Sequence, residues 1–214
     1  MARSTGLFIS FEGIEGTGKT TQAQLLSARL SARGHRTVLT HEPGGTVIGD
    51  RVREILLLPE HREMSSTTEL LLYNAARAQH LAELILPALE RGDAVITDRF
   101  ADSTVAYQGY ARGIDLTLIT SLDGIATGGT RPELTILFDL DVETGLRRNR
   151  DINKVDRLEL ETIEFHRRVR EGFLEIARAE PGRVKVVDAS LPPEAVAERV
   201  WEIVQTKLRD QNQE

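Results

Sequence analysis

The feature that most constrains this chain is residues 7–22. This stretch opens with an apolar run typical of a buried strand, continues as Gly13-x-x-x-x-Gly18-Lys19-Thr20, and passes into a helical segment. Glycines let successive backbone N–H groups turn toward one anion, and the positive end of the following helix points at the same place. The pattern therefore predicts a phosphate-binding loop, or P-loop, formed by Gly13, Ile14, Glu15, Gly16, Thr17, Gly18, Lys19, Thr20 and Thr21.

The chemistry of such a loop assigns roles to single side chains. The amine of Lys19 would reach the β- and γ-phosphates of a nucleotide, and the hydroxyl of Thr20 would sit on Mg²⁺. Asp98 closes a later apolar run, which is the setting of an aspartate that holds Mg²⁺ through water. We therefore expect ATP as a ligand and Mg²⁺ as a cofactor, with Thr20 and Asp98 as the metal-binding residues.

Composition narrows the class of protein. The 214 residues suit a single domain spanning 1–214, and the net charge of −6 argues against a nucleic-acid-binding protein. No apolar run approaches the length of a membrane span, and the N-terminus lacks the pattern of a signal peptide. The chain contains no cysteine, which excludes disulfides, thiol catalysis and thiolate metal sites. We expect a cytoplasmic enzyme with no nucleic-acid or membrane partner.

Apolar runs alternate with helical patterns along the chain. The expected strands are Leu7–Glu12, Thr37–His41, Ala94–Asp98, Leu134–Leu140 and Val184–Asp188. The expected helices are Lys19–Ala32, Val47–Leu57, Thr67–Leu86, Leu116–Ala126, Val142–Arg148, Arg157–Ala179 and Glu194–Leu208. This order predicts an α/β fold, a three-layer α/β/α sandwich with a five-stranded parallel sheet and ligands at the carboxyl ends of its strands.

Polar residues follow several of these strands. Arg99 comes directly after Asp98, and its planar guanidinium would bind the oxygens of a transferring phosphate. Glu42 and Pro43 begin a turn after the second strand, and Arg53 in the next helix would point back at an acceptor phosphate. A surface salt bridge at Arg99 and a turn without a ligand are the structural alternatives.

Tyr73 and Arg77 share one face of an expected helix. An aromatic ring with an arginine one turn later can stack on a base and hydrogen-bond to its edge, although spacing alone favours an ordinary surface pair. A polar cluster in the segment after the third strand includes Thr104, Tyr107 and Gln108 and indicates nothing by itself.

Residues 147–157 contain four arginines and one lysine and have little apolar content. Such a run is either a solvated connection or a short mobile lid, which we place at about residues 148–157. Phosphoryl transfer develops charge on the γ-phosphoryl oxygens, and none of the four variable positions of the P-loop is basic. A lid that closes with its arginines over the phosphates would supply the missing charge and expel water.

Two other classes of protein use a P-loop. Residues 153–156, Asn-Lys-Val-Asp, resemble the guanine-reading pattern of GTPases, but that pattern should follow a buried strand and here follows an arginine-rich helix end. No aspartate has a glycine three residues later, as the γ-phosphate sensor of a GTPase requires. A non-enzymatic ATP-dependent assembly protein would not need a second anion site at Arg53 and Arg99 or a basic lid.

In combination, these residues make the chain resemble the thymidylate kinase family, and within it the bacterial type. The resemblance runs from Phe11 to Ser190. It rests on the P-loop with its preceding Phe11-Glu12, on Glu42-Pro43-Gly44-Gly45-Thr46, Ala75-Ala76-Arg77, Asp98-Arg99-Phe100, Ser103-Thr104, Ala106-Tyr107-Gln108-Gly109, Arg131-Pro132, Leu134-Thr135 and Asp156-Arg157-Leu158-Glu159. It implies a P-loop NTPase fold and direct in-line transfer of the ATP γ-phosphoryl group to dTMP, giving dTDP and ADP. It also implies a homodimer, formed by an apolar helix such as the one after Thr67 or Leu116.

The resemblance implies a role for each matching residue. Glu15 reaches the 3′-hydroxyl of dTMP, Tyr107 excludes a ribose 2′-hydroxyl, and Tyr73, where phenylalanine is commoner, stacks on thymine. The dTMP-binding residues it implies are Glu15, Glu42, Pro43, Arg53, Tyr73, Arg77, Arg99, Thr104, Tyr107 and Gln108. Arg148 lies by adenine, and Arg150 lies by the transferred phosphate, with Lys154 and Arg157 as other candidates for that position. The catalytic residues are then Lys19, Arg99, Arg150 and Glu15, and no general base is needed because the attacking phosphate oxygen is already ionised.

Overall fold

The computed structural model describes residues 6–150 and 156–211. Its centre is a five-stranded parallel sheet in the order β2-β3-β1-β4-β5. The strands are β1 (Leu7–Glu12), β2 (Thr37–His41), β3 (Ala94–Asp98), β4 (Leu134–Asp139) and β5 (Val184–Asp188). Because β1 and β3 lie inside the sheet with helices on both faces, nearly all their side chains are buried, which explains their continuous apolar runs.

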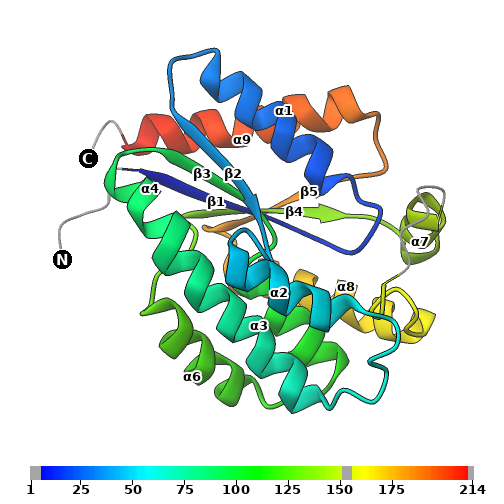
Figure 1. The fold of residues 1–214 in the computed structure, drawn as a ribbon. Helices are drawn as coiled ribbons and strands as arrows, with labels where there is room; N and C mark the ends of the chain where they lie inside the picture. The colour runs from blue at the N-terminus through cyan, green and yellow to red at the C-terminus, as the bar shows by residue number, and fades with distance from the viewer. Residues whose placement is uncertain (1–5, 151–155, 212–214) are drawn as a thin grey trace.

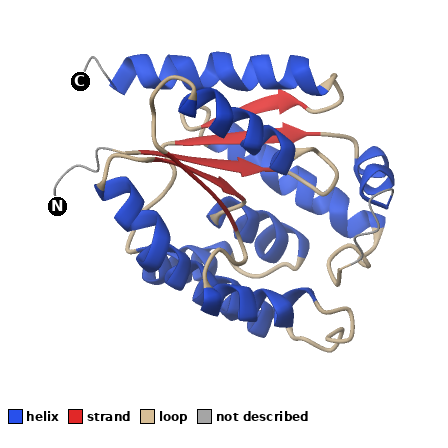
Figure 2. Ribbon diagram, turned by 45° about the horizontal axis from the view of Figure 1, so that its top comes forward, coloured by secondary structure: helices blue, strands red, loops and turns tan. Residues whose placement is uncertain are grey.

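Helices cover both faces of the sheet, and this confirms the predicted sandwich (Figure 1). Along the chain they are α1 (Lys19–Ser31), α2 (Val47–Leu57), α3 (Ser66–His80), α4 (Leu86–Glu90), α5 (Ala101–Thr104), α6 (Leu116–Thr127), α7 (Val142–Arg150), α8 (Ile163–Ala179) and α9 (Pro193–Gln211). Figure 2 shows the strands between the two helical layers. Helices α1 and α9 pack together on one face, while α8 and the helices around α3 lie on the other.

The cores on the two faces are apolar and separate. Leu26 and Leu30 of α1 pack with Trp201 of α9 against the sheet. On the opposite face, α8 presents the predicted stripe of Phe165, Val169 and Phe173, all of which are buried. In the part of the chain that the structure describes, no helix is both long enough and apolar enough to span a membrane.

The helices differ from the prediction in several places. The helix expected from Thr67 to Leu86 ends at His80 and continues as the π-helical segment η1 (Leu81–Ile85) before α4. The segment after β3 is also helical, as α5 followed by the π-helical segment η2 (Val105–Ala111), which the residue pattern did not predict. Residues 151–155 of the predicted lid lie outside the described residues.

The predicted start of α8 at Arg157 is wrong, because α8 begins at Ile163. The side chain of Thr162 accepts a hydrogen bond from the backbone N–H of Phe165 and caps the helix there. Before it, the carboxylate of Asp156 accepts from the N–H groups of Leu158 and Glu159, which folds these residues into a turn.

Candidate active site

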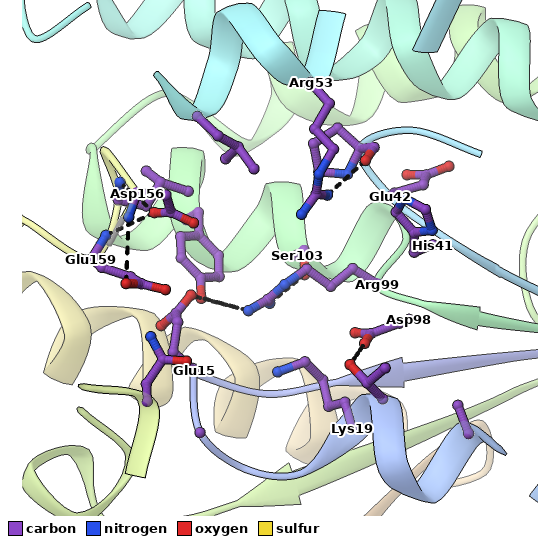
Figure 3. Close-up of a pocket in the computed structure, with 18 of the residues that line it drawn as sticks. Glu15, Lys19, His41, Glu42, Arg53, Asp98, Arg99, Ser103, Asp156 and Glu159 are labelled. Carbon is purple, nitrogen blue, oxygen red and sulfur yellow. Dashed lines mark hydrogen bonds and ion pairs between the residues drawn. The ribbon is translucent and has the colours of Figure 1, made fainter. Parts of the chain in front are cut away.

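A single pocket of about 720 Å³ lies at the carboxyl ends of β1, β2 and β3 (Figure 3). Parallel sheets of this type bind their ligands at this edge. The pocket brings together most of the predicted site residues, namely Glu15, Gly16, Gly18, Lys19, Thr20, Thr21, Glu42, Pro43, Arg53, Tyr73, Asp98, Arg99, Thr104, Tyr107, Gln108 and Arg148.

The P-loop curls tightly around the amine of Lys19. Gly18 has a φ of 86°, a left-handed conformation suited to glycine, and α1 begins at the next residue. The Nζ of Lys19 donates to the carbonyl oxygens of Gly13 (3.0 Å) and Ile14 (2.7 Å). Burial, reinforced by the positive charge of Arg99, lowers the pKa of Lys19 to about 8. The loop therefore holds a poorly solvated ammonium group at the start of a helix, where an anion is favoured.

The P-loop also packs directly against α7, the helix that leads into the predicted lid. A Cβ added at Gly16 would lie 2.0 Å from the carbonyl oxygen of Gly145, and one added at Gly145 would lie 2.6 Å from that of Glu15. Such close backbone approach is possible only for glycine at both positions. The contact places the chain that carries Arg148 beside the phosphate-binding loop.

Thr20 and Asp98 meet at the edge of the pocket. The hydroxyl of Thr20 donates to Oδ2 of Asp98 over 2.5 Å, so the two predicted metal-binding side chains lie together although they come from different elements. Hydroxyl and carboxylate oxygens are ligands that Mg²⁺ prefers, and Mg²⁺ in kinases needs only one or two protein ligands besides phosphate and water. The donors present therefore fit the ion that the sequence predicts.

Arg99 is held in the centre of the pocket by its backbone. Its φ is 75°, which is uncommon for a residue other than glycine. Its N–H donates to the carbonyl oxygen of Phe11, and its own carbonyl oxygen accepts from the hydroxyl of Thr97. These contacts fix a conformation that costs energy, as often found where a side chain must be aimed.

The guanidinium of Arg99 contacts the P-loop and its acid. Nη1 donates to the carbonyl oxygen of Gly13 over 2.9 Å. Nη2 donates to Oε1 of Glu15 and to the hydroxyl oxygen of Tyr107, each over 3.1 Å. The hydroxyl of Tyr107 in turn donates to the same Oε1 over 2.5 Å. Arginine, acid and phenol therefore form one cluster between the phosphate loop and the rest of the pocket.

The carboxylate of Glu15 remains ionised in this cluster. Burial alone would raise its pKa, but the contact with His166 and the positive charges of Arg99 and Lys19 lower it below its usual range. His166 was not among the predicted site residues, because a histidine inside a helical apolar pattern gives no signal of its own.

The helix that follows the turn after β2 brings another cation into the pocket. Arg53 of α2 donates through Nη1 to the carbonyl oxygen of Pro43 over 2.8 Å, and Figure 3 shows its guanidinium extending from α2 toward Arg99. Beneath the turn, the buried carboxylate of Glu42 accepts from Nε of Arg77 (2.9 Å) and lies 3.0 Å from Nδ1 of His80. The turn is therefore anchored by charge as well as by its backbone.

Arg77 lies behind the pocket lining and not at its surface. Its side chain is 1% exposed, and its Nη2 donates to the hydroxyl of Thr104 over 3.0 Å. Tyr73, Thr104 and Gln108 do line the pocket, and Gln108 is fixed by a 2.8 Å hydrogen bond to the carboxylate of Glu69. In this conformation Arg77 supports the lining residues Glu42 and Thr104.

The lid residues fall into three groups. Arg148 lines the pocket and donates to the carbonyl oxygen of Ala189 over 3.0 Å. Arg150 ends α7, and its side chain, like residues 151–155 with Lys154, lies outside the described part of the structure. Arg157 is buried and points away from the pocket, donating to the carbonyl oxygen of Leu56 and to the carboxylate of Glu69.

The pocket contains further polar residues that were not predicted as site residues. Asp156 and Glu159 line it on the side of Glu15, and burial raises the pKa of each carboxyl. Their place in the motif Asp156-Arg157-Leu158-Glu159 was a signal that could have marked them. His41 and Asn149 also line the pocket and had no such signal.

Comparisons with known proteins show the family of this chain. The sequence profile described as thymidylate kinase matches residues 11–200. The chain belongs to the thymidylate kinase family. A thymidylate kinase from Syntrophotalea carbinolica is 50% identical over 200 residues, covering 91% of this chain and 93% of that protein. One from Gloeobacter violaceus is 52% identical over 206 residues, covering 95% and 97%.

The fold of the family is also found among solved structures. The crystal structure of thymidylate kinase from Ehrlichia chaffeensis matches with a TM-score of 0.76 and 37% identity, covering 93% of this chain and 98% of that one. The chain described above therefore has the thymidylate kinase fold, which is a P-loop NTPase fold.

Proposed function

We propose that this protein transfers the γ-phosphoryl group of ATP to dTMP, giving ADP and dTDP, a step toward dTTP. The observation that carries the proposal is that one pocket holds two cationic positions. Lys19 lies in the P-loop, Arg53 extends into the pocket from α2 on the opposite side, and Arg99 lies between them. Two anions bound there would face each other, as a phosphoryl donor and an acceptor must.

The donor side is supported by the P-loop. Its backbone N–H groups and Lys19 would bind the phosphates of ATP, and Arg148 would lie near the adenine. Thr20 and Asp98 would hold Mg²⁺, which when bound neutralises charge on the phosphates. Lys19 donates to the carbonyl oxygens of Gly13 and Ile14, and binding of ATP would exchange these hydrogen bonds for bonds to its phosphates.

The acceptor side is supported by side chains that converge on the same pocket. Arg53 and Arg99 would bind the phosphate of dTMP, which attacks as an oxygen already ionised and needs no general base. Tyr73 would stack on thymine, with Thr104 and Gln108 facing the base or sugar. Glu15 would accept from the sugar 3′-hydroxyl, and Tyr107 would occupy the space of a 2′-hydroxyl. Arg150 would reach the transferred phosphate when the lid closes.

We also propose that residues 1–214 act as one cytoplasmic kinase domain that forms a homodimer through α3 and α6. These two helices pack side by side and carry exposed apolar side chains, including Leu71 of α3 and Leu116, Leu118 and Ile125 of α6. Exposed apolar side chains gathered on adjacent helices are typical of a surface that another subunit covers. Sedimentation of the wild type beside an Ile125→Glu variant tests this proposal.

The experiment that tests the function is an ADP-release assay with ATP and Mg²⁺ against dTMP, dUMP, UMP, dCMP and thymidine. We expect dTMP to have the highest kcat/KM, and thymidine, which lacks the acceptor phosphate, to give no turnover. A higher kcat/KM for another monophosphate would assign the acceptor site to that nucleotide. Turnover of thymidine in place of dTMP would contradict the role of Arg53 and Arg99.

A further inference from the structure

His166 lies in the interior beside the active site but outside the pocket lining. It is 0% exposed, on the second turn of α8. Among the described residues neither Nδ1 nor Nε2 has a hydrogen-bond partner, and the same holds for Oε2 of Glu15. These two orphaned atoms are neighbours, because Nδ1 of His166 lies 3.5 Å from Oε2 of Glu15.

Two buried polar atoms without hydrogen-bond partners, Nδ1 of His166 and Oε2 of Glu15, need an explanation when they lie this close. A buried donor or acceptor is destabilising unless it is hydrogen-bonded, and most buried polar atoms in proteins are paired. The imidazole ring stands edge-on to Phe165, which belongs to an apolar core cluster, with ring centroids 5.6 Å apart. The carboxylate of Glu15 is the polar group that the structure places within reach of His166.

The two oxygens of Glu15 have different surroundings. Oε1 accepts from Arg99 and Tyr107, which face the pocket. Oε2 is turned toward α8, where His166 lies. A carboxylate held at one oxygen only can rotate about its last bond, whereas one held at both oxygens keeps a fixed plane.

We propose that His166 is a positioning residue that donates its Nδ1–H to Oε2 of Glu15 and so fixes the orientation in which Oε1 meets Arg99 and Tyr107. The donor is preorganised because α8 is anchored by the buried Val169 and Phe173. The hydrogen bond forms by a small shift of either side chain from 3.5 Å to ordinary length. The effect on catalysis rests on the proposed function, since Glu15 is the residue proposed to contact dTMP.

The test uses two substitutions, one that keeps a hydrogen-bond donor and one that keeps the volume of the ring. His166→Asn places an amide nitrogen close to the position of Nδ1, whereas His166→Phe fills the same volume without a donor. We expect His166→Phe to raise the KM for dTMP about 10-fold, the size expected for loss of one hydrogen bond to a charged group, and to leave the KM for ATP within about twofold. His166→Asn should restore most of the affinity for dTMP.

Each substitution is repeated in a Glu15→Gln background. If His166 acts through Glu15, His166→Phe should change the KM for dTMP less than twofold when the carboxylate is already gone. The same increase in both backgrounds, or a rise in both KM values, would assign His166 to core packing and overturn the proposal. Thermal unfolding of each variant shows whether it is folded under assay conditions.

A spectroscopic measurement separates this proposal from the proposed function. The ¹⁵N shifts of the imidazole nitrogens in the wild-type protein report which nitrogen bears the proton. Among the signals of the five histidines, those of His166 are identified by their absence from the His166→Asn variant. We expect a protonated Nδ1 whose shift changes in Glu15→Gln. A bare Nδ1 would refute the hydrogen bond whatever the substrate, while failure of the wild type to use dTMP would refute only the function.

Discussion

Glu12 and Glu15 lie three residues apart at the carboxyl end of β1. Burial favours a raised pKa for both carboxyls, yet the pKa of Glu12 is raised and that of Glu15 is lowered. Glu12 is fully buried, and burial together with the Asp102 carboxylate raises its pKa to about 8. Glu15 has a side chain 12% exposed, and although burial would raise its pKa, the contacts with His166 and Arg99 lower it. The end of β1 therefore carries a carboxyl that favours the neutral form, and the loop after it carries one that favours the ionised form.

The difference lies in the donors that reach each carboxyl. Glu12 accepts from the N–H of Phe100 (2.7 Å) and the hydroxyl of Ser103 (2.6 Å), both uncharged groups. Glu15 accepts directly from the guanidinium of Arg99. Uncharged donors cannot offset the cost of burying a charge as a cation does. The comparison indicates that Glu12 holds the turn beside Arg99 in place, while Glu15 supplies charge to the pocket.

The largest effect should come from Lys19→Ala, which removes the cation that faces both acids. We expect kcat to fall on the order of 10³-fold, as for loss of a preorganised group that stabilises developing charge. Burial lowers the pKa of Lys19 to about 8, which means that keeping its amine charged at neutral pH destabilises the folded protein. Removal of this amine should therefore not lower the thermal stability at neutral pH. Steady-state ADP release and thermal unfolding are the measurements.

Lys19→Met is the matched control, since it keeps the length of the side chain without its charge. It should lose as much activity as Lys19→Ala. Near-wild-type turnover in either variant would show that the ammonium group is not needed for phosphoryl transfer.

The next effect should come from Glu15→Gln, which keeps the shape of the side chain and removes its charge. The KM for dTMP should rise roughly 10- to 100-fold, since hydrogen bonds to charged groups contribute about 1.5–3 kcal/mol. Because the pKa of Glu15 is lowered, its ionised carboxylate contributes to the free energy of unfolding above the unfolded-state pKa of 4.5. That contribution is lost as the pH falls through the folded-state pKa. Kinetics with dTMP and urea unfolding at acid pH are the measurements. An unchanged KM would exclude contact with the acceptor.

Much of the fold followed from the sequence, because its signals are local. The strands β1, β2, β3 and β5 have the predicted bounds. The inner strands β1 and β3 are short apolar runs that both helical layers cover, whereas the edge strands β2 and β5 are partly exposed. The start of α8 was missed because Thr162 caps the helix late and Asp156 forms a turn first. Such competition between side-chain caps depends on which conformation the surrounding packing selects.

The sequence predicted the parts of the site in which neighbouring residues act together. It did not predict the contacts between residues that are far apart in the chain. The P-loop with Lys19 is continuous, so its pattern carries its geometry. The burial of Arg77 against Glu42 and the contact of His166 with Glu15 join elements far apart in the chain. For the same reason no pattern near β1 distinguishes the charge of Glu15 from that of Glu12.

A smaller effect is expected from Tyr107→Phe, which removes the hydroxyl that donates to Oε1 of Glu15. Affinity for dTMP should change little because Arg99 still contacts this oxygen. The ratio of kcat/KM for dTMP to that for its ribonucleotide form should fall about 10-fold, as for a contact of about 1.4 kcal/mol. Both substrates are measured with the wild type and the variant. An unchanged ratio would remove Tyr107 from the exclusion of ribonucleotides.

The smallest effect on activity should come from Glu12→Gln, because a glutamine resembles the neutral acid that Glu12 favours. We expect kcat/KM at pH 7 to stay within about threefold of the wild type, since one uncharged acceptor replaces another.

The effect of Glu12 should appear instead in the pH dependence of stability. Its folded-state pKa of about 8 exceeds the unfolded-state value of 4.5, so the folded state binds more protons between these values. The contribution of Glu12 to the free energy of unfolding is therefore fully present below pH 4.5 and is lost as the pH rises through about 8.

Urea unfolding at pH 5, 7 and 9 should show this decline in the wild type and a flatter profile in Glu12→Gln. Glu15→Gln, as the control, should keep the decline, because its own loss lies on the acid side. If the wild type and Glu12→Gln gave parallel profiles, Glu12 would be ionised like Glu15, and the contrast between the two acids would fail.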